Sequence, residues 1–527
     1  MKGFPRIKLL FICLFCVDLL KLQAQPAMIP LNGNIEERFA FALNNCKISF
    51  HNSQKPYNIN QLKLLGIDSV FNQLQLPVLR DTFKGSKPNQ DEQYAILEIN
   101  PLFMIGEGYD KSDISKRISE YSIGAVLNVQ YKSKLALNAY YLTANASYPD
   151  FIRSKIENNH VVPSQGYAFG TELGYHHKEW GGYISWSPSR YFLLDAGQGK
   201  HFWGDGYRSL FLSDVANNYP YLRMTTNVWH LQYVNLYANF KDVRNTDGKY
   251  KSFKDKFATL HYLSWNVSKR INLSFFESVV WQAKDTLNNR GYDVNYLNPV
   301  IFFRPVEYSL GSSDNSLIGL SSRVKMFKTV QIYGQWLIDE FLLSEMMNNK
   351  GWWGNKYGLQ VGIKYFNPIG IKGLTLQSEV NMVRPYTYSH GSILQNYGHF
   401  GQALAHPLGA NFREGILIAS FIKKRWSIMN KFIYAQFGTD TAGINFGGDI
   451  YQDYTTRNGD FGHFLLQGQF NTLIDNEVRI EYMISGKMNT FAFVTYIHRK
   501  SNGMNRQISD YIFAGIKTGI FRSYYDY

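Results

Sequence analysis

From Tyr94 to the end of the chain, segments of about ten residues that alternate apolar and polar side chains recur. Period-two alternation places one apolar face and one polar face on each segment, which predicts β-strands. About ten residues is also the length that a tilted strand needs to cross a membrane. The clearest examples are KLALNAYYL (134–142), NLSFFESVVW (272–281), GLQVGIKYF (358–366) and FAFVTYIH (491–498).

The connections between these segments fall into two lengths. Tight turns are expected at 131–134, 268–270, 327–329 and 423–425, and long loops at about 145–166, 201–227, 283–315, 342–356, 385–410 and 439–460. Short turns on one side and long loops on the other are typical of an outer-membrane barrel. A soluble sandwich or propeller also has many strands but does not predict this division.

We count the strands by assigning successive connections to opposite sides of the membrane. This count predicts an all-β transmembrane fold, an antiparallel barrel of about eighteen strands, in the range of roughly sixteen to twenty. The alternation of short and long connections fails around 201–254 and again near the end of the chain. We expect DYIFAGIKTGIFRSYYDY (510–527) to form a final aromatic strand.

The amino-acid composition agrees with a membrane boundary. Aromatic residues make up 16% of the chain and charged residues 18%, against about 25% charged residues in an ordinary soluble domain. Tyrosine and tryptophan gather at membrane–water interfaces, and their rings also stack on sugars. After Ala24 no apolar run reaches the roughly 18 residues of a membrane-spanning helix.

The N-terminus predicts export. Residues 1–24 have a basic start, a short apolar core and a small-residue cleavage site, as a signal peptide does. Residues 25–93 are expected to form a small helical periplasmic region, with a short helix starting near Asn34, a weaker helical pattern at 57–74 and a linker at 84–93. Residues 94–527 would then form the barrel.

The formal net charge is +14, and the predicted signal carries +3 of it, which leaves +11. In an exported protein such an excess favours anionic partners, here outer-membrane lipid and lipopolysaccharide or an acidic surface polysaccharide, rather than nucleic acid. The alternative is that the basic residues only solvate loops. Cys46 would be the one cysteine left after cleavage, so no internal disulfide is expected.

The sequence shows no catalytic or cofactor motif. Ser322-x-x-Lys325, Ser313-Asp314-Asn315 and Lys517-Thr518-Gly519 match the penicillin-recognising elements in letters, but their order is wrong and a strand carries the serine. His390, His399 and His406 share one loop without a spacing diagnostic of a metal site. We therefore expect no enzyme, no cofactor and no metal.

Three stretches, 201–229, 298–315 and 384–412, combine aromatic rings with Arg, Asp, Glu and Asn. Such residues suit a sugar, but they also suit the polar network that fills a wide barrel. We expect 207–214 to form a short strand or a segment that crosses the lumen, with Arg208 and Asp214 facing opposite charges. The candidate ligand-binding residues are Trp203, Asp205, Tyr207, Arg208, Asp214, Arg304, Glu307, Arg384, Tyr386 and His390.

The same stretches carry a family resemblance. GQGKHFWGDGYRSLFLSD (197–214), PYLRMTTNVWHLQY (220–233), YLNPVIFFRPVEYSLGSSDN (296–315), GWWGNKYGLQ (351–360) and the stretch 384–412 resemble the Wzi-like outer-membrane barrels of Bacteroidetes. Within that group, the resemblance is strongest to the gliding-motility-associated RemB-like branch. It covers about 94–527 and is densest over 195–412.

The resemblance implies a barrel of around eighteen strands with a helical periplasmic part. Capsule-assembly members of the family bind surface polysaccharide without catalysis, and RemB-like members are surface components linked to gliding. It therefore implies a non-enzymatic barrel for capsule or exopolysaccharide attachment or for gliding motility, with motility or secretion proteins as further partners. The alternatives are an outer-membrane channel for small solutes and an outer-membrane hydrolase.

Overall fold

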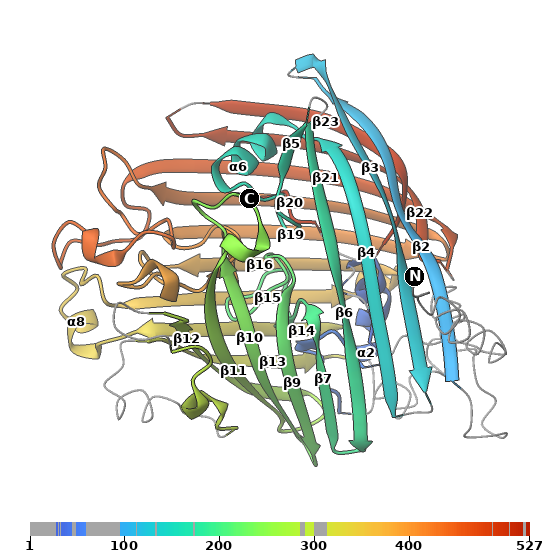
Figure 1. Cartoon of the computed structure of the whole chain (residues 1–527), viewed down its shortest axis with the longest axis horizontal. Helices are drawn as coiled ribbons and strands as arrows, with labels where there is room; N and C mark the ends of the chain where they lie inside the picture. The colour runs from blue at the N-terminus through green and yellow to red at the C-terminus, as the bar shows by residue number, and fades with distance from the viewer. Residues whose placement is uncertain are drawn as a thin grey trace, which may run out of the picture.

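The described part of the chain is mostly a wall of paired strands. The computed structural model describes residues 28–58 without 30, 32 and 45–48, and residues 95–527 without 112, 132–133, 172–173, 285–289, 300–313, 487, 505 and 520–522. Eighteen long strands pair with their neighbours in antiparallel fashion, and β2 pairs with β23 to close the ring. The predicted antiparallel barrel of about eighteen strands is thus confirmed (Figure 1).

The wall strands are β2 (Ala95–Asp110), β3 (Asp113–Tyr131), β4 (Leu135–Ser147), β6 (Gly174–Ser189), β7 (Phe192–Gly199), β9 (Tyr219–Val228), β10 (Leu231–Asp242), β11 (Lys254–Asn266), β12 (Ile271–Gln282), β13 (Asn315–Met326), β14 (Val330–Glu340), β15 (Lys356–Phe366), β16 (Leu374–Val383), β19 (Phe412–Lys423), β20 (Trp426–Thr439), β21 (Gln469–Ser485), β22 (Thr490–Asn502) and β23 (Gln507–Thr518).

Shorter elements lie outside this ring or extend it. The short strands are β1 (Gln54–Lys55), β5 (Phe169–Thr171), β8 (Phe202–Trp203), β17 (Gly398–His399) and β18 (Gln402–Ala403). The helices are α2 (Gly33–Asn44), α6 (Asp150–Asn159) and α8 (Leu343–Met347), with 3₁₀ turns η1 (Tyr250–Ser252), η2 (Val294–Leu297), η3 (Pro368–Gly370), η4 (Ile393–Gln395) and η5 (Tyr454–Thr456). None of the helices in the described ranges has the length and apolarity needed to cross a membrane.

The two ends of the barrel differ as the sequence predicts. At one end the connections are two to seven residues long, at 132–134, 190–191, 229–230, 267–270, 327–329, 367–373, 424–425 and 486–489. At the other end lie long loops at 148–173, 200–218, 243–253, 283–314, 341–355, 384–411 and 440–468, beside two short connections at 111–112 and 503–506. We call these the turn end and the loop end.

One predicted loop is wrong. Residues 201–227 were expected to be a single long loop, but β9 begins at Tyr219 and turns at Trp229 into β10. The missing strand accounts for the failed alternation around 201–254. Arg223 of β9 faces inward to Asp195 of β7, with Nε 3.0 Å from Oδ1, and Leu222 faces outward. The inner face also carries the buried rings of Tyr219 and Tyr221, so both faces of β9 contain apolar residues and the alternation is weak.

The outer face of the wall is apolar. Ile123 is 70% exposed and Tyr141 is 48% exposed, whereas inward neighbours such as Ser122 and Tyr140 are buried. Exposed aromatic residues gather at the turn end, as in the aromatic girdle of a membrane barrel. They include Tyr131, Trp186, Trp229, Trp265, Tyr365, Trp426 and Tyr482.

The N-terminal segment packs at the turn end, inside the wall. The predicted helix near Asn34 is confirmed as α2, and its Arg38 Nη1 donates to the Lys424 carbonyl at 2.9 Å. Lys325 Nζ from β13 donates to the Leu43 carbonyl at 2.9 Å, and β1 pairs with β8. The predicted signal peptide, the linker and most of the 57–74 pattern lie outside the described residues.

The lumen on the side of β9 to β16 is filled by an apolar core. Leu210, Phe211 and Leu212 from the loop 200–218 are fully buried against inward side chains of the wall. The Phe211 ring stacks on Phe276 of β12 at 4.8 Å, and Gly319 of β13 lies so close that a Cβ there would meet that ring at 2.3 Å. Side chains from 384–411 complete this core, so two loops fold into the barrel.

The end of the chain corrects another prediction. The last strand, β23, ends at Thr518 rather than continuing to Tyr527, and residues 523–527 lie inside the barrel (Figure 1, C). Tyr524 and Asp526 are 2% and 4% exposed. The reason is electrostatic: Asp526 finds three donors inside the lumen, which an outward-facing wall strand does not offer.

Candidate functional site

The segment that crosses the lumen, residues 204–218, is held by its backbone. The carboxylate of Glu379 on β16 accepts hydrogen bonds from the Tyr207 and Arg208 amides, at 2.7 and 3.0 Å. Gln335 of β14 accepts from the Leu210 amide at 2.7 Å. A Cβ at Gly206 would lie 2.5 Å from Glu379 Oε2, so glycine allows this close approach.

Arg208 is the centre of a buried charge network. Its side chain is 1% exposed and donates to Glu414 of β19 at 3.1 Å and to Asp526 at 3.0 Å. Asp526 also accepts from Lys431 Nζ of β20 at 2.5 Å and from the Tyr207 hydroxyl at 2.6 Å. Burial alone would raise the pKa of Asp526, but the cations of Arg208 and Lys431 hold it below its usual value.

The other candidate residues in the lumen also contact other parts of the chain. Trp203 is fully buried and packs on Tyr262 of β11 at 5.3 Å, which leaves its ring no face for a sugar. Asp205 pairs with Arg323 of β13 at 3.2 Å. Asp214 accepts a hydrogen bond from the Tyr524 hydroxyl at 2.7 Å, and its charge also acts on the buried Lys200. For these residues the geometry favours the lumen network over sugar contact.

Arg384, Tyr386 and His390 lie apart from that network, at the loop end. Arg384 Nε donates to the Asn355 carbonyl at 2.7 Å, and the Tyr386 hydroxyl donates to the Asn445 carbonyl at 3.0 Å. The buried His390 ring meets Tyr454 edge-on at 5.5 Å. Arg304 and Glu307 lie outside the described residues.

Arg384, Tyr386 and His390 lie next to an aromatic cluster that was not among the candidates from the sequence. The rings of Trp353 and Tyr454 lie 4.8 Å apart, and the Arg457 guanidinium lies 3.9 Å from the Trp353 ring centroid. Lys356 Nζ lies 4.8 Å from the Tyr454 ring centroid. We call Trp353, Tyr454 and Arg457 the loop-face cluster.

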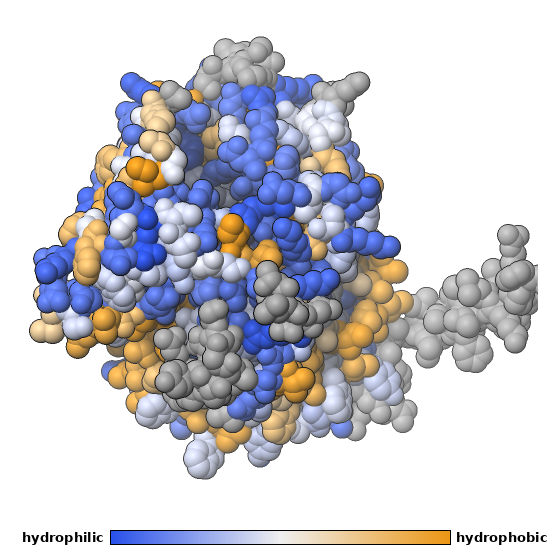
Figure 2. Space-filling view, turned by 60° about the vertical axis from the view of Figure 1, so that its left-hand side comes forward, coloured by the Kyte–Doolittle hydropathy of each residue, from blue (hydrophilic) through white to orange (hydrophobic). Residues whose placement is uncertain are grey.

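The loop-face cluster is half-buried, and hydrogen bonds of its own loops hold it in place. Tyr454 is in η5, where Asp453 accepts a hydrogen bond from the Thr455 amide at 2.7 Å. Trp353 donates its backbone amide to the Asp460 carbonyl at 3.0 Å. Figure 2, which brings the loop end forward, shows mainly hydrophilic side chains there and hydrophobic ones along the flanks. Half-buried rings with polar neighbours can stack on a sugar, and the guanidinium that fixes the Trp353 ring is itself paired with Asp460 at 2.5 Å.

The signal for this cluster in the sequence was weak. GWWGNKYGLQ contains Trp353, but Tyr454 and Arg457 come from another loop that folding brings alongside. Only the pairing of β14, β15 and β20 with their neighbours places those loops together.

The three histidines of the loop 384–411 do not converge. His399 accepts a hydrogen bond from the Lys241 amide at 2.9 Å, and His406 Nε2 lies 2.7 Å from Glu414. Burial lowers the pKa of His390 to about 4 and that of His399 to about 3, so both rings are neutral near pH 7. Within the described ranges, no group of three or more His, Cys, Asp and Glu side chains is arranged to hold a metal ion.

No family model and no curated protein matches the sequence. Among solved structures, the barrel is similar to Wzi of Escherichia coli, which is described as an outer-membrane protein involved in group 1 capsule assembly and a carbohydrate-binding β-barrel. The two share 11% identity, the match covers 94% of this chain and 100% of that one, and the TM-score is 0.54.

Two other barrels are more distant. OccAB4 of Acinetobacter baumannii has 10% identity over 82% of this chain and 99% of its own, with a TM-score of 0.44. OprD of Pseudomonas aeruginosa has 8% identity over 83% of this chain and 100% of its own, with a TM-score of 0.42. The similarity to Wzi supports a Wzi-like barrel fold and, at this identity, nothing finer.

Proposed function

We propose that the protein is a non-enzymatic outer-membrane barrel that binds an acidic surface polysaccharide at its loop-face cluster. Barrels of the outer membrane place short turns in the periplasm and long loops outside. In that orientation the loop-face cluster faces the cell surface, and residues 25–93, after removal of a signal peptide at 1–24, belong to the periplasmic side.

One observation carries this proposal: Trp353, Tyr454 and Arg457 form a half-buried aromatic and cationic cluster on the loop end of a barrel whose lumen is largely filled. The net charge of +11 that remains without the signal peptide favours an anionic partner, whether lipopolysaccharide or capsule. The description of Wzi as a carbohydrate-binding barrel supports the same class of ligand.

The biological setting that we propose is attachment of capsule or exopolysaccharide, or gliding motility with motility or secretion proteins as partners. It rests on the resemblance of the lumen-crossing and loop stretches to the RemB-like branch of Bacteroidetes. The rival function, a channel for small solutes, requires a continuous open path, which the apolar core opposes on one side of the lumen.

The test is polysaccharide binding by full-length protein in detergent micelles, measured by biolayer interferometry on immobilised acidic exopolysaccharide and on neutral dextran. Trp353→Ala and Tyr454→Ala should each weaken binding about tenfold, because each removes one stacking face. Trp229→Ala removes a 95% exposed tryptophan at the turn end and should leave binding unchanged.

Equal binding by all three variants and the native protein would rule out the loop-face cluster. Binding to dextran as strong as to the acidic polymer would rule out the charge requirement. Loss of binding in Trp229→Ala alone would show that the binding site lies at the turn end.

A further inference from the structure

A cavity remains on the side of the lumen opposite the apolar core. It has a volume of about 270 Å³ and lies between strands β2–β4, β6 and β20–β23 and the C-terminal residues 523–526. It extends from Pro149 and Ile152 at the start of α6 to Lys517–Gly519 at the turn end of β23. Its size is near the lower limit of ligand pockets, about 300 Å³, and suits a small molecule.

The cavity is lined by more carboxylates than cations. The acidic lining residues are Glu37, Glu120, Glu179, Asp475, Glu477 and Asp526, and the basic ones are Lys431, Arg479 and Lys517. The cations are already paired with carboxylates. Lys431 Nζ bonds Glu477 at 2.8 Å and Asp526 at 2.5 Å, Arg479 bonds Glu477, and Lys517 Nζ bonds Glu481 at 2.9 Å.

Two of the remaining carboxylates have oxygens that accept no hydrogen bond from the described residues. Asp475 is 1% exposed and has two such oxygens, and its ion-pair partner Arg499 lies 3.7 Å away. Glu179 is 5% exposed, and its Oε1 accepts none within the described residues. An ionised carboxylate only accepts hydrogen bonds, and a buried acceptor without a donor costs about 1–3 kcal/mol.

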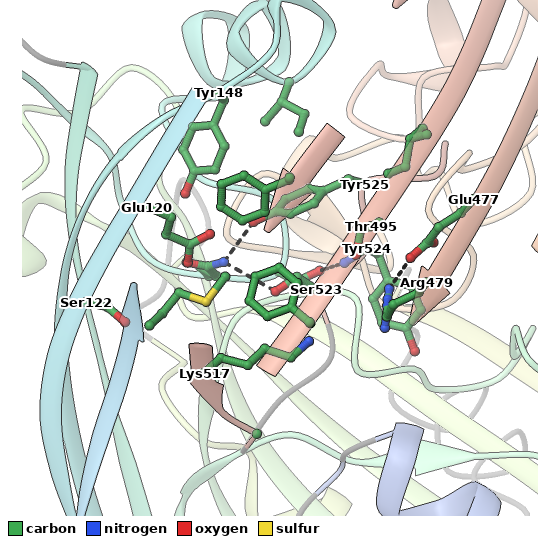
Figure 3. Close-up of a pocket in the computed structure, with 18 of the residues that line it drawn as sticks. Glu120, Ser122, Tyr148, Glu477, Arg479, Thr495, Lys517, Ser523, Tyr524 and Tyr525 are labelled. Atoms are coloured by element: carbon green, nitrogen blue, oxygen red, sulfur yellow. Dashed lines mark hydrogen bonds and ion pairs between the residues drawn. The ribbon is translucent and has the colours of Figure 1, made fainter. Parts of the chain in front are cut away.

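Tyrosine rings also line the cavity. The rings of Tyr148 and Tyr525 are 6.0 Å apart, and Gln165 Nε2 fixes the Tyr525 hydroxyl at 3.0 Å. Figure 3 shows Glu120 and Ser122 of β3 on one side of the cavity, Ser523–Tyr525 in the middle, and Glu477 with Arg479 of β21 on the other side. Aromatic faces attract cations, so they add to the carboxylates rather than oppose them.

We propose that this cavity is a second binding site, distinct from the loop-face cluster, and that it takes a small organic amine in its ammonium form. Each ammonium group supplies three donors and one positive charge to a carboxylate such as Glu179 or Asp475, and the carbon chain packs on the tyrosine rings. The ligand reaches the cavity from the turn end, where Lys517–Gly519 line it. The site does not depend on polysaccharide binding.

The experiment compares two probes of the same shape on full-length protein in detergent by isothermal titration calorimetry at pH 7.5. Cadaverine carries terminal ammonium groups, and 1,5-pentanediol carries hydroxyls in the same places. Cadaverine should bind at least about tenfold more tightly, the value of one charge-assisted hydrogen bond.

The variants locate the site. Glu179→Gln and Asp475→Asn keep the side-chain shape and should each weaken cadaverine binding about tenfold. Ser122→Leu keeps both carboxylates but fills the cavity, and it should abolish binding of both probes. Glu345→Gln, on the exposed α8, is the matched control and should change nothing.

Four results would each overturn the proposal. They are the absence of a heat of binding for cadaverine, equal affinity for the amine and the diol, unchanged affinity in both carboxylate variants, and full displacement of cadaverine by an equal concentration of Ca²⁺. A variant that loses the heat-modifiable gel shift of a folded barrel is judged unfolded and is left out. The proposal is then tested by the loss of binding in Ser122→Leu and by the difference in affinity between cadaverine and the diol.

Discussion

At the scale of single residues, Arg208 joins three parts of the chain that lie far apart in the sequence. It connects the lumen-crossing segment to Glu414 of β19 and to Asp526 near the C-terminus. The charged character of such a residue can be predicted, because a barrel lumen must be filled with satisfied polar groups. Its partners cannot be predicted, since only the closed ring brings them together.

Replacing Arg208 should destabilise the fold strongly. Arg208→Met leaves Asp526 and Glu414 buried with one cation fewer, which costs about 3–5 kcal/mol. Arg153→Met is the control, because Arg153 pairs with Asp150 on the exposed side of α6 and such pairs contribute about 0–1 kcal/mol. The midpoint of guanidinium unfolding in detergent measures both. Equal midpoints for the two variants would contradict the buried network.

His390 should make the protein sensitive to acid. Burial lowers its folded pKa to about 4 from the usual 6.5, so between these values the unfolded chain binds a proton that the folded chain does not. The stability that neutral His390 contributes is therefore full above pH 6.5 and is lost as the pH falls toward 4.

His390→Gln should flatten that dependence by about 1–3 kcal/mol between pH 7 and 4. The unfolding midpoint of the variant and the native protein, followed over this range, is the measurement. Two curves of the same slope would show that His390 is protonated equally in both states.

At the scale of elements, alternation predicted most of the wall, but it missed one strand and extended another too far. β4, β12, β15 and β22 contain the four segments with the clearest pattern. β9 was missed because the buried rings of Tyr219 and Tyr221 place apolar residues on its inner face as well. The final strand was placed too far along the chain, because RSYYDY has period-two aromatics whether it pairs with a neighbour or, like 523–527, packs inside.

Deleting residues 523–527 tests that correction. Since β23 ends at Thr518, the deletion should leave a folded barrel with its heat-modifiable gel shift, but with a lower unfolding midpoint because Arg208 and Lys431 lose Asp526. Asp526→Asn should show part of the same loss. A deletion that removes the gel shift altogether would instead support an essential final strand within 510–527.

At the scale of the whole molecule, the barrel is a scaffold with an unevenly filled interior. The apolar core packs against β9–β16, the charge network joins β16, β19 and β20 to the C-terminal residues, and the N-terminal segment packs at the turn end. The loop-face cluster then rests on loops that are anchored inside the wall. The sequence predicts the wall and the segment that crosses the lumen, but not the partners of that segment, which depend on contacts between distant loops.

Single-channel recording in planar lipid bilayers tests most directly whether the barrel is a scaffold for binding rather than an open channel. The native protein in 1 M KCl should give no steady conductance steps, because the core, the N-terminal segment and residues 523–527 occupy the lumen. Deletion of 523–527 serves as the positive comparison and should give more frequent openings. Steady steps from the native protein that grow in proportion to salt concentration would contradict the account and favour a channel.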